Sequence, residues 1–162
     1  MAKGGAFASI MGATPQEVAN NEFMIDRAME LRNKLVPIGY ATFFPSFGGT
    51  IEQVAGKDAA EFYAAAAGKF KEGIPADNEA FEKYLGGSKY FAGDHVTVCD
   101  FHMYELLDQQ RSMFGKAIYA GYSKIQAFMA AFGGLPQIQA AYAKYDLPAN
   151  NEMAWTTVAN IV

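Results

Sequence analysis

The sequence predicts an all-α fold, a bundle of about six helices, and three observations carry this prediction. Apolar side chains recur at three- and four-residue spacing in several segments, as one buried face of a helix requires. Helix-start signals precede some of these segments, and Gly-Gly pairs follow two of them. No segment alternates apolar and polar residues convincingly enough to indicate a strand. At 162 residues the chain is long enough to bury one sizeable core.

The first predicted helix begins at Thr14-Pro-Gln-Glu17, a capping box with Pro at the first helical position. Its apolar positions continue to Leu35, and Pro37 should kink or end it because Pro removes a hydrogen-bond donor. We interpret residues 38–49, rich in aromatic residues, Gly and Pro, as a partly buried loop.

A second helix is predicted from Thr50 to Glu72, with an Ala-rich centre suited to close packing. Residues 73–78, which include Gly73 and Pro75, are interpreted as a break. A short helix then runs through Tyr84 and ends at Gly86-Gly87.

The most apolar predicted helix follows the turn at Gly93-Asp94 and should stop near Phe114. Thr97 is its N-cap candidate, and Asp100, three residues later, can reach back to the backbone N–H of Thr97. Val96 and Phe101 have the spacing of a hydrophobic staple. A helix this apolar belongs in the middle of a bundle, so the others should pack around it.

Two further helices are predicted, from Tyr122 to Phe132 and from Pro136 to about Tyr145. The chain then divides into a lead segment, residues 1–13, a helical domain, residues 14–147, and a tail, residues 148–162, packed on the bundle.

Composition narrows the possible partners and compartments. A net charge of −4 and a pI near 5.1 argue against nucleic acid or an anionic membrane surface. No apolar run approaches the roughly 20 residues of a membrane span. The one cysteine, Cys99, cannot form an internal disulfide. We therefore expect a cytoplasmic protein, and an organelle reached with a targeting peptide that is later removed stays open.

Few residues have the pattern of a catalytic or metal site. His95 and His102 are the only histidines, and seven residues across a helix start is not a metal-ligand spacing. Cys99 has apolar neighbours and is interpreted as a small buried hydrophobic residue. Asp100 is expected to act in folding. We predict no catalytic residue and no metal site.

At this point the motifs resemble a known family. Tyr90-Phe-Ala-Gly-Asp-x-Val-Thr-x-x-Asp-Phe101, followed by Leu106-Leu-Asp108, resembles the core-helix motif of the C-terminal domain of cytosolic glutathione transferases, mu class and its sigma-group relatives. The segment from Phe128 to Tyr142 is similar to the last two helices of that domain, and Met153-Ala-Trp155 to the mu-class tail. The resemblance covers roughly residues 12 to 160 and implies the fold of that domain.

The same resemblance implies what this chain is expected to lack. In the family, a thioredoxin-like N-terminal domain binds glutathione and supplies the Tyr or Ser that stabilises its thiolate. Residues 1–13 are too short for such a domain, so we expect most of the glutathione site to be missing.

The resemblance also assigns three residues of this chain, by loose alignment with the family, as possible contacts with a ligand or partner. Asp26 aligns with the mu-class acidic residue that reaches the glutathione of the neighbouring subunit, although an exposed helical carboxylate is the simpler interpretation. Tyr40 stands near the family's pocket-lining tyrosine, with core packing as its alternative. Trp155 belongs to the tail that resembles the mu class.

Two functions follow from these expectations. The first is a non-catalytic binding or structural subunit, an adaptor in a larger assembly or a homodimer, with protein partners and no cofactor. The second is one part of a glutathione transferase that conjugates glutathione to electrophiles, with the glutathione-binding domain on another chain. We prefer the first, which leaves catalysis by this chain an open question.

Overall fold

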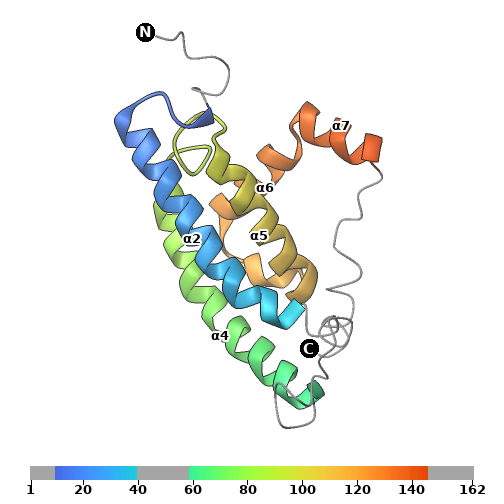
Figure 1. Ribbon diagram of the computed structural model, residues 1–162. Coiled ribbons are helices and arrows are strands. Elements are labelled where there is room, and N and C mark those ends of the chain that lie inside the picture. Colours follow the sequence, from blue (N-terminus) through green and yellow to red (C-terminus); the bar gives the residue numbers. More distant parts are fainter. Residues whose placement is uncertain (1–9, 40–58, 146–162) are drawn as a thin grey trace.

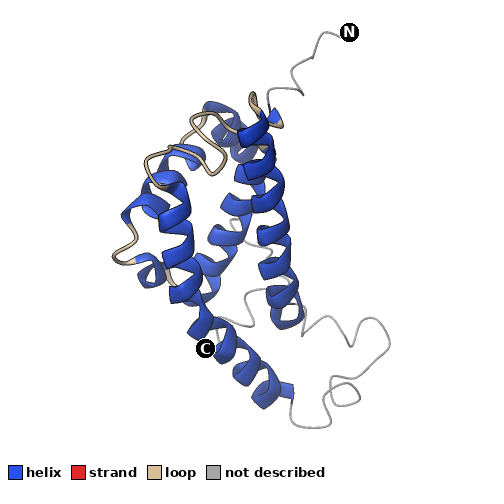
Figure 2. Ribbon diagram, turned by 90° about the vertical axis from the view of Figure 1, so that its left-hand side faces the viewer, coloured by secondary structure: helices blue, strands red, loops and turns tan. Residues whose placement is uncertain are grey.

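The computed structural model describes residues 10–39 and 59–145, and the regular secondary structure of these residues is entirely helical, with helices joined by turns and no strand (Figures 1 and 2). They form five α-helices and one 3₁₀ helix: α2 Pro15–Gly39, α4 Ala59–Leu85, α5 Val98–Phe114, η2 Lys116–Tyr119, α6 Ser123–Gly133 and α7 Pro136–Tyr145. The predicted all-α fold is confirmed. None of these helices is both long and apolar enough to cross a membrane.

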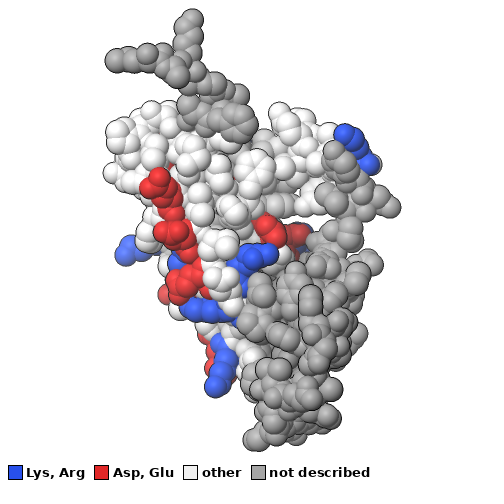
Figure 3. Space-filling model, in the orientation of Figure 1, with Lys and Arg blue, Asp and Glu red and all other residues white. Residues whose placement is uncertain are grey.

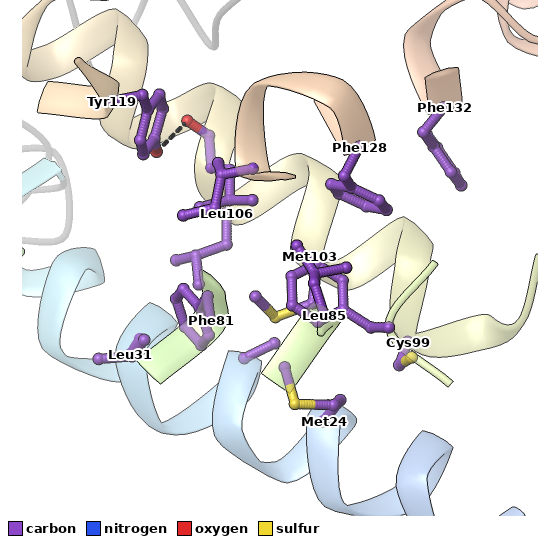
Figure 4. Close-up of a cluster of buried hydrophobic side chains, with 14 of the residues drawn as sticks. Met24, Leu31, Phe81, Leu85, Cys99, Met103, Leu106, Tyr119, Phe128 and Phe132 are labelled. Carbon is purple, nitrogen blue, oxygen red and sulfur yellow. Dashed lines mark hydrogen bonds between the residues drawn. The ribbon is translucent and has the colours of Figure 1, made fainter. Parts of the chain in front are cut away.

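The predicted central helix, α5, packs against α2, α6 and η2. α4 lies beside α2 and contacts α6 and η2, whereas α7 extends away from α2, α4 and α5 and contacts α6 (Figure 1). Every helix from α2 to α6, η2 included, contributes to one buried cluster (Figure 4). The cluster contains, among others, Met24, Leu31, Phe81, Leu85, Met103, Leu106, Tyr119 and Phe128.

Most helix ends fall where the local signals place them. α5 ends at Phe114, and the next residue, Gly115, has φ of +84°, a value that side chains with a Cβ rarely adopt. α2 begins at Pro15, directly after its predicted cap. It continues through Pro37 to Gly39, the last described residue before residue 59.

The predicted break at residues 73–78 is wrong, because α4 runs through this stretch without interruption to Leu85. Ile74 and Asn78 are buried there, and the Asn78 side-chain amide donates to the backbone carbonyl of Ile118 at 2.9 Å. Asp77 forms an ion pair with Arg27 of α2. These contacts with other elements outweigh the helix-breaking tendency of Gly73 and Pro75, which is only a local preference.

The continuity of α4 can be tested at Pro75, which is exposed and inside the helix. Pro75→Ala restores a backbone donor facing the preceding turn and removes a ring clash, so the free energy of unfolding should rise by roughly 1–3 kcal/mol. Chemical denaturation measures this change.

Gly73→Ala is the matched control, because a Cβ there meets nothing within 4 Å. It should add roughly 0.5–1 kcal/mol through helix propensity alone. Loss of stability in both variants would show that the chain is not helical at these positions.

Candidate functional site

The start of α5 is organised by the carboxylate of Asp100, which is fully buried. Its Oδ2 accepts hydrogen bonds from the Thr97 backbone N–H at 2.7 Å and from the Thr97 hydroxyl at 3.0 Å. Its Oδ1 accepts from the backbone N–H of Phe91 at 2.9 Å. Thr97 and Asp100 form a capping box, so the carboxylate joins the helix start to the turn before it.

The second buried group at this end is the thiol of Cys99. Burial and the neighbouring Asp100 carboxylate raise the pKa of the Cys99 thiol to about 12. The backbone N–H of Cys99 donates to the side-chain oxygen of Asn21, on α2, at 2.8 Å. One of the free amides of the α5 N-terminus is thus satisfied from α2. A thiol so placed is protonated at neutral pH and is a poor nucleophile.

The two residues predicted to form the hydrophobic staple, Val96 and Phe101, differ in burial. Val96 is partly buried and packs against the core. Phe101 is 47% exposed, and its ring lies edge-on against Phe132 of α6, with centroids 5.0 Å apart. Phe101 therefore carries apolar surface outward from a helix whose opposite side is core.

The remaining predicted site residues are dispersed. Asp26 is exposed on α2, and Tyr40 and Trp155 lie outside the described residues. For the two histidines no site role is predicted. His95 is 58% exposed and its Nε2 lies 3.2 Å from a Glu17 carboxylate oxygen. His102, on α5, is half-buried and lines a small surface hollow together with Met29 and Arg32 of α2.

Glu17 has a wider role than its capping box. Its Oε2 accepts from the backbone N–H groups of Ala13 at 2.8 Å and Thr14 at 2.9 Å, and these bonds, with a smaller effect of His95, lower its pKa. Its Oε1 faces His95 and lies against Gly93, where a Cβ would approach it to 3.0 Å. The carboxylate thus links the start of α2 to the turn before α5.

Two surface features escaped the sequence analysis. Phe23 is 58% exposed on α2 and stacks on Tyr84 of α4, with centroids 5.7 Å apart and rings inclined by 21°. Grooves of about 350 and 260 Å³ flank α6, the first lined by Arg111 and Lys116 and the second by aromatic side chains. The one sequence signal for the exposed aromatic surface was an apolar residue, Phe23, next to Glu22 on an otherwise polar helix face.

What the described residues can do chemically is limited. They contain no group of three or more His, Cys, Asp or Glu side chains that could hold a metal ion. Burial raises the pKa of Tyr119, whose hydroxyl donates to the backbone carbonyl of Leu107 at 2.8 Å. Burial also raises the pKa of Asp108, which forms an ion pair with Arg111. Tyr119 therefore joins η2 to α5, whereas the Asp108–Arg111 pair lies within α5.

Asp100→Ala tests the structural role of the carboxylate. The substitution leaves the Phe91 and Thr97 N–H groups without their acceptor in a buried site, so the free energy of unfolding should fall by about 2–4 kcal/mol. Denaturant unfolding measures this loss, and an unchanged transition midpoint would contradict the role.

Asp100→Asn is the matched variant, because it keeps an acceptor oxygen but cannot ionise. Burial raises the pKa of Asp100 above its usual 3.8, so the carboxyl favours the folded state most at pH below 3.8. That contribution is lost as the pH rises through the raised folded-state pKa. The unfolding free energy of Asp100→Asn minus that of the unaltered chain should therefore increase with pH across this window. A difference independent of pH would contradict the shift.

The buried thiol predicts slow labelling. At mildly alkaline pH an aromatic disulfide reagent should leave Cys99 unmodified in the folded chain and titrate one thiol in denaturant. The labelling rate should follow the unfolding rate. Fast labelling of the folded chain would place the thiol on the surface.

Comparison with known proteins shows which family this helical domain resembles. The family model for the C-terminal domain of glutathione S-transferase matches residues 49–145. Glutathione S-transferase Mu 5 of Rattus norvegicus is 29% identical over 150 residues, which cover 90% of this chain and 57% of that protein. Glutathione S-transferase Mu 6 of Mus musculus is 38% identical over 72 residues, covering 44% and 33%. The matched regions thus span from a third to just over half of these relatives.

Solved structures show the same fold. The glutathione S-transferase Blo t 8 superposes with a TM-score of 0.69 at 20% identity, covering 90% of this chain and 62% of that one. Rat hPGDS in complex with a quinoline gives a TM-score of 0.68 at 15% identity, covering 88% and 63%. The family model spans more than half of this chain, and the resemblance inferred from the core-helix motif is confirmed. The chain belongs to the family of glutathione S-transferase C-terminal domains, with mu-class relatives.

Proposed function

We propose that this domain works by binding, as a non-catalytic structural or adaptor subunit that contacts a partner protein or a second copy of itself. The observation that carries the proposal is the exposed ring of Phe23 on α2, which stacks on the half-buried Tyr84 of α4. Exposed aromatic side chains are enriched where proteins meet, because they bury much apolar area on contact.

The surroundings of this stack suggest the chemistry of the partner. Glu22 and Asp26 are exposed on the same helix, while Glu30 pairs with Arg27 and Lys34, and Figure 3 shows acidic side chains gathered over α2 with basic ones among them. Asp26 and Phe23 lie three residues apart, on neighbouring positions of one helix face. A partner with an apolar centre and a basic rim would complement this surface. Asp26 then contacts the partner at the rim.

The ionisable groups support a non-catalytic role. Asp100, Cys99 and Tyr119 are engaged inside the bundle, and burial keeps the thiol and phenol protonated at neutral pH. The proposal needs no cofactor. A cytoplasmic setting fits a chain whose one cysteine is a buried thiol.

The alternative is glutathione conjugation, and the mu-class relatives favour it, because the two compared above are named glutathione S-transferases. In that case the helical domain would contribute to a site completed by a glutathione-binding domain. Glutathione would then be the co-substrate.

Phe23→Glu tests the binding role. It places a charge at the centre of the contact, so dimers or complexes of the purified chain should weaken by at least tenfold in analytical ultracentrifugation. Phe23 is exposed, so the variant should stay folded. Glu79→Gln, an exposed position on α4, is the control and should leave assembly unchanged.

Retention on immobilised glutathione and conjugation of a chloronitrobenzene substrate test the alternative. Activity of the purified chain in both assays would overturn the non-catalytic role. Assembly that is indifferent to Phe23→Glu would remove the α2–α4 surface from the proposal.

A further inference from the structure

A second surface, between α5, α6 and α7, has a different chemistry from the Phe23–Tyr84 face. Four aromatic side chains line its groove of about 260 Å³: Phe101, Tyr104, Phe132 and Tyr142. The remaining lining side chains are aliphatic except for Glu105, whose carboxylate is exposed. No Lys, Arg or His is among the described lining residues, so the groove combines aromatic faces with one negative charge.

The aromatic wall is held in place by close packing. The Tyr104 and Phe132 rings have centroids 5.0 Å apart at an inclination of 33°, and Phe101 meets Phe132 edge-on at the same distance. Phe132 itself is buried at the margin of the core cluster (Figure 4). A rigid wall of this kind loses little conformational entropy when a ligand binds.

The Tyr104 hydroxyl is positioned by its neighbours. A Cβ on Gly133 would lie 2.7 Å from this oxygen, so the absence of a side chain there makes room for it. Burial and the nearby Tyr142 raise the pKa of Tyr104 to about 12, which keeps the phenol neutral. A neutral phenol keeps the negative face of its ring without adding a full charge.

Aromatic faces with a nearby carboxylate attract organic cations, because the ring quadrupole and the carboxylate both favour positive charge. Quaternary ammonium groups suit such sites best, since their methyl groups contact the rings while the charge stays unpaired by hydrogen bonds. We propose that this groove is a binding site for a small organic cation with an N-methylated ammonium group. The side chains that bind it are Phe101, Tyr104 and Glu105.

A contrast in charge within the same structure supports a cation. The other groove beside α6 has the opposite character, with Arg111 and Lys116 in its lining. A variant in that groove can therefore serve as the control for variants in the aromatic groove.

Choline and its uncharged isostere 3,3-dimethylbutanol are the probes, because they share shape and differ in charge. Titration of the full chain by calorimetry or ligand-observed NMR should show choline binding at least about fivefold more tightly than the isostere. Higher salt should weaken the binding of choline and leave the binding of the isostere unchanged.

Three variants locate the site. Phe101→Leu and Glu105→Gln alter exposed side chains, so the fold should persist, and each should weaken choline binding about three- to tenfold. Lys116→Gln changes the other groove and should have no effect. Equal binding of both probes, no choline binding up to millimolar concentration, or binding indifferent to Phe101→Leu and Glu105→Gln would each overturn the proposal.

Discussion

The carboxylate of Asp100 accepts hydrogen bonds from two backbone amides that would otherwise be buried without a partner, those of Phe91 and Thr97. Desolvation of a carboxylate is costly, and here it is offset only while these bonds are made together. The turn before α5 and the first turn of α5 therefore form as one unit. Phe91 is carried into the core by this turn and packs on Phe128 at a centroid distance of 4.8 Å. The position of α6 thus depends indirectly on Asp100.

The same helix start is joined to α2 by residues far apart in the sequence. The Asn21 side chain accepts from the Cys99 amide, and Glu17 meets His95 in the turn before α5. Both contacts cap or support a helix N-terminus from outside its own helix. Local signals therefore define where α2 and α5 begin, while these long-range contacts set how the two starts lie side by side.

The difference between local signals and long-range contacts explains how much of the structure the sequence could predict. The capping boxes at Thr14 and Thr97 and the end of α5 at Phe114 depend on neighbouring residues, and they were predictable. The continuity of α4 depends on Asn78 and Asp77 meeting other helices, which no local pattern reveals. The surface sites were hidden for the same reason. Phe101 has the spacing of a staple residue, and only the position of Phe132 shows that its ring faces a groove.

Structural and binding roles alternate along α5 because consecutive helical residues point about 100° apart. Cys99 and Met103 face the core, whereas Phe101, Tyr104 and Glu105 line the groove. A motif that spans this helix start therefore mixes residues required for folding with residues free to contact a ligand. Resemblance in the folding residues establishes family membership without establishing activity. Function has to be sought at the outward positions, where substitution changes binding while the Asp100 network stays intact.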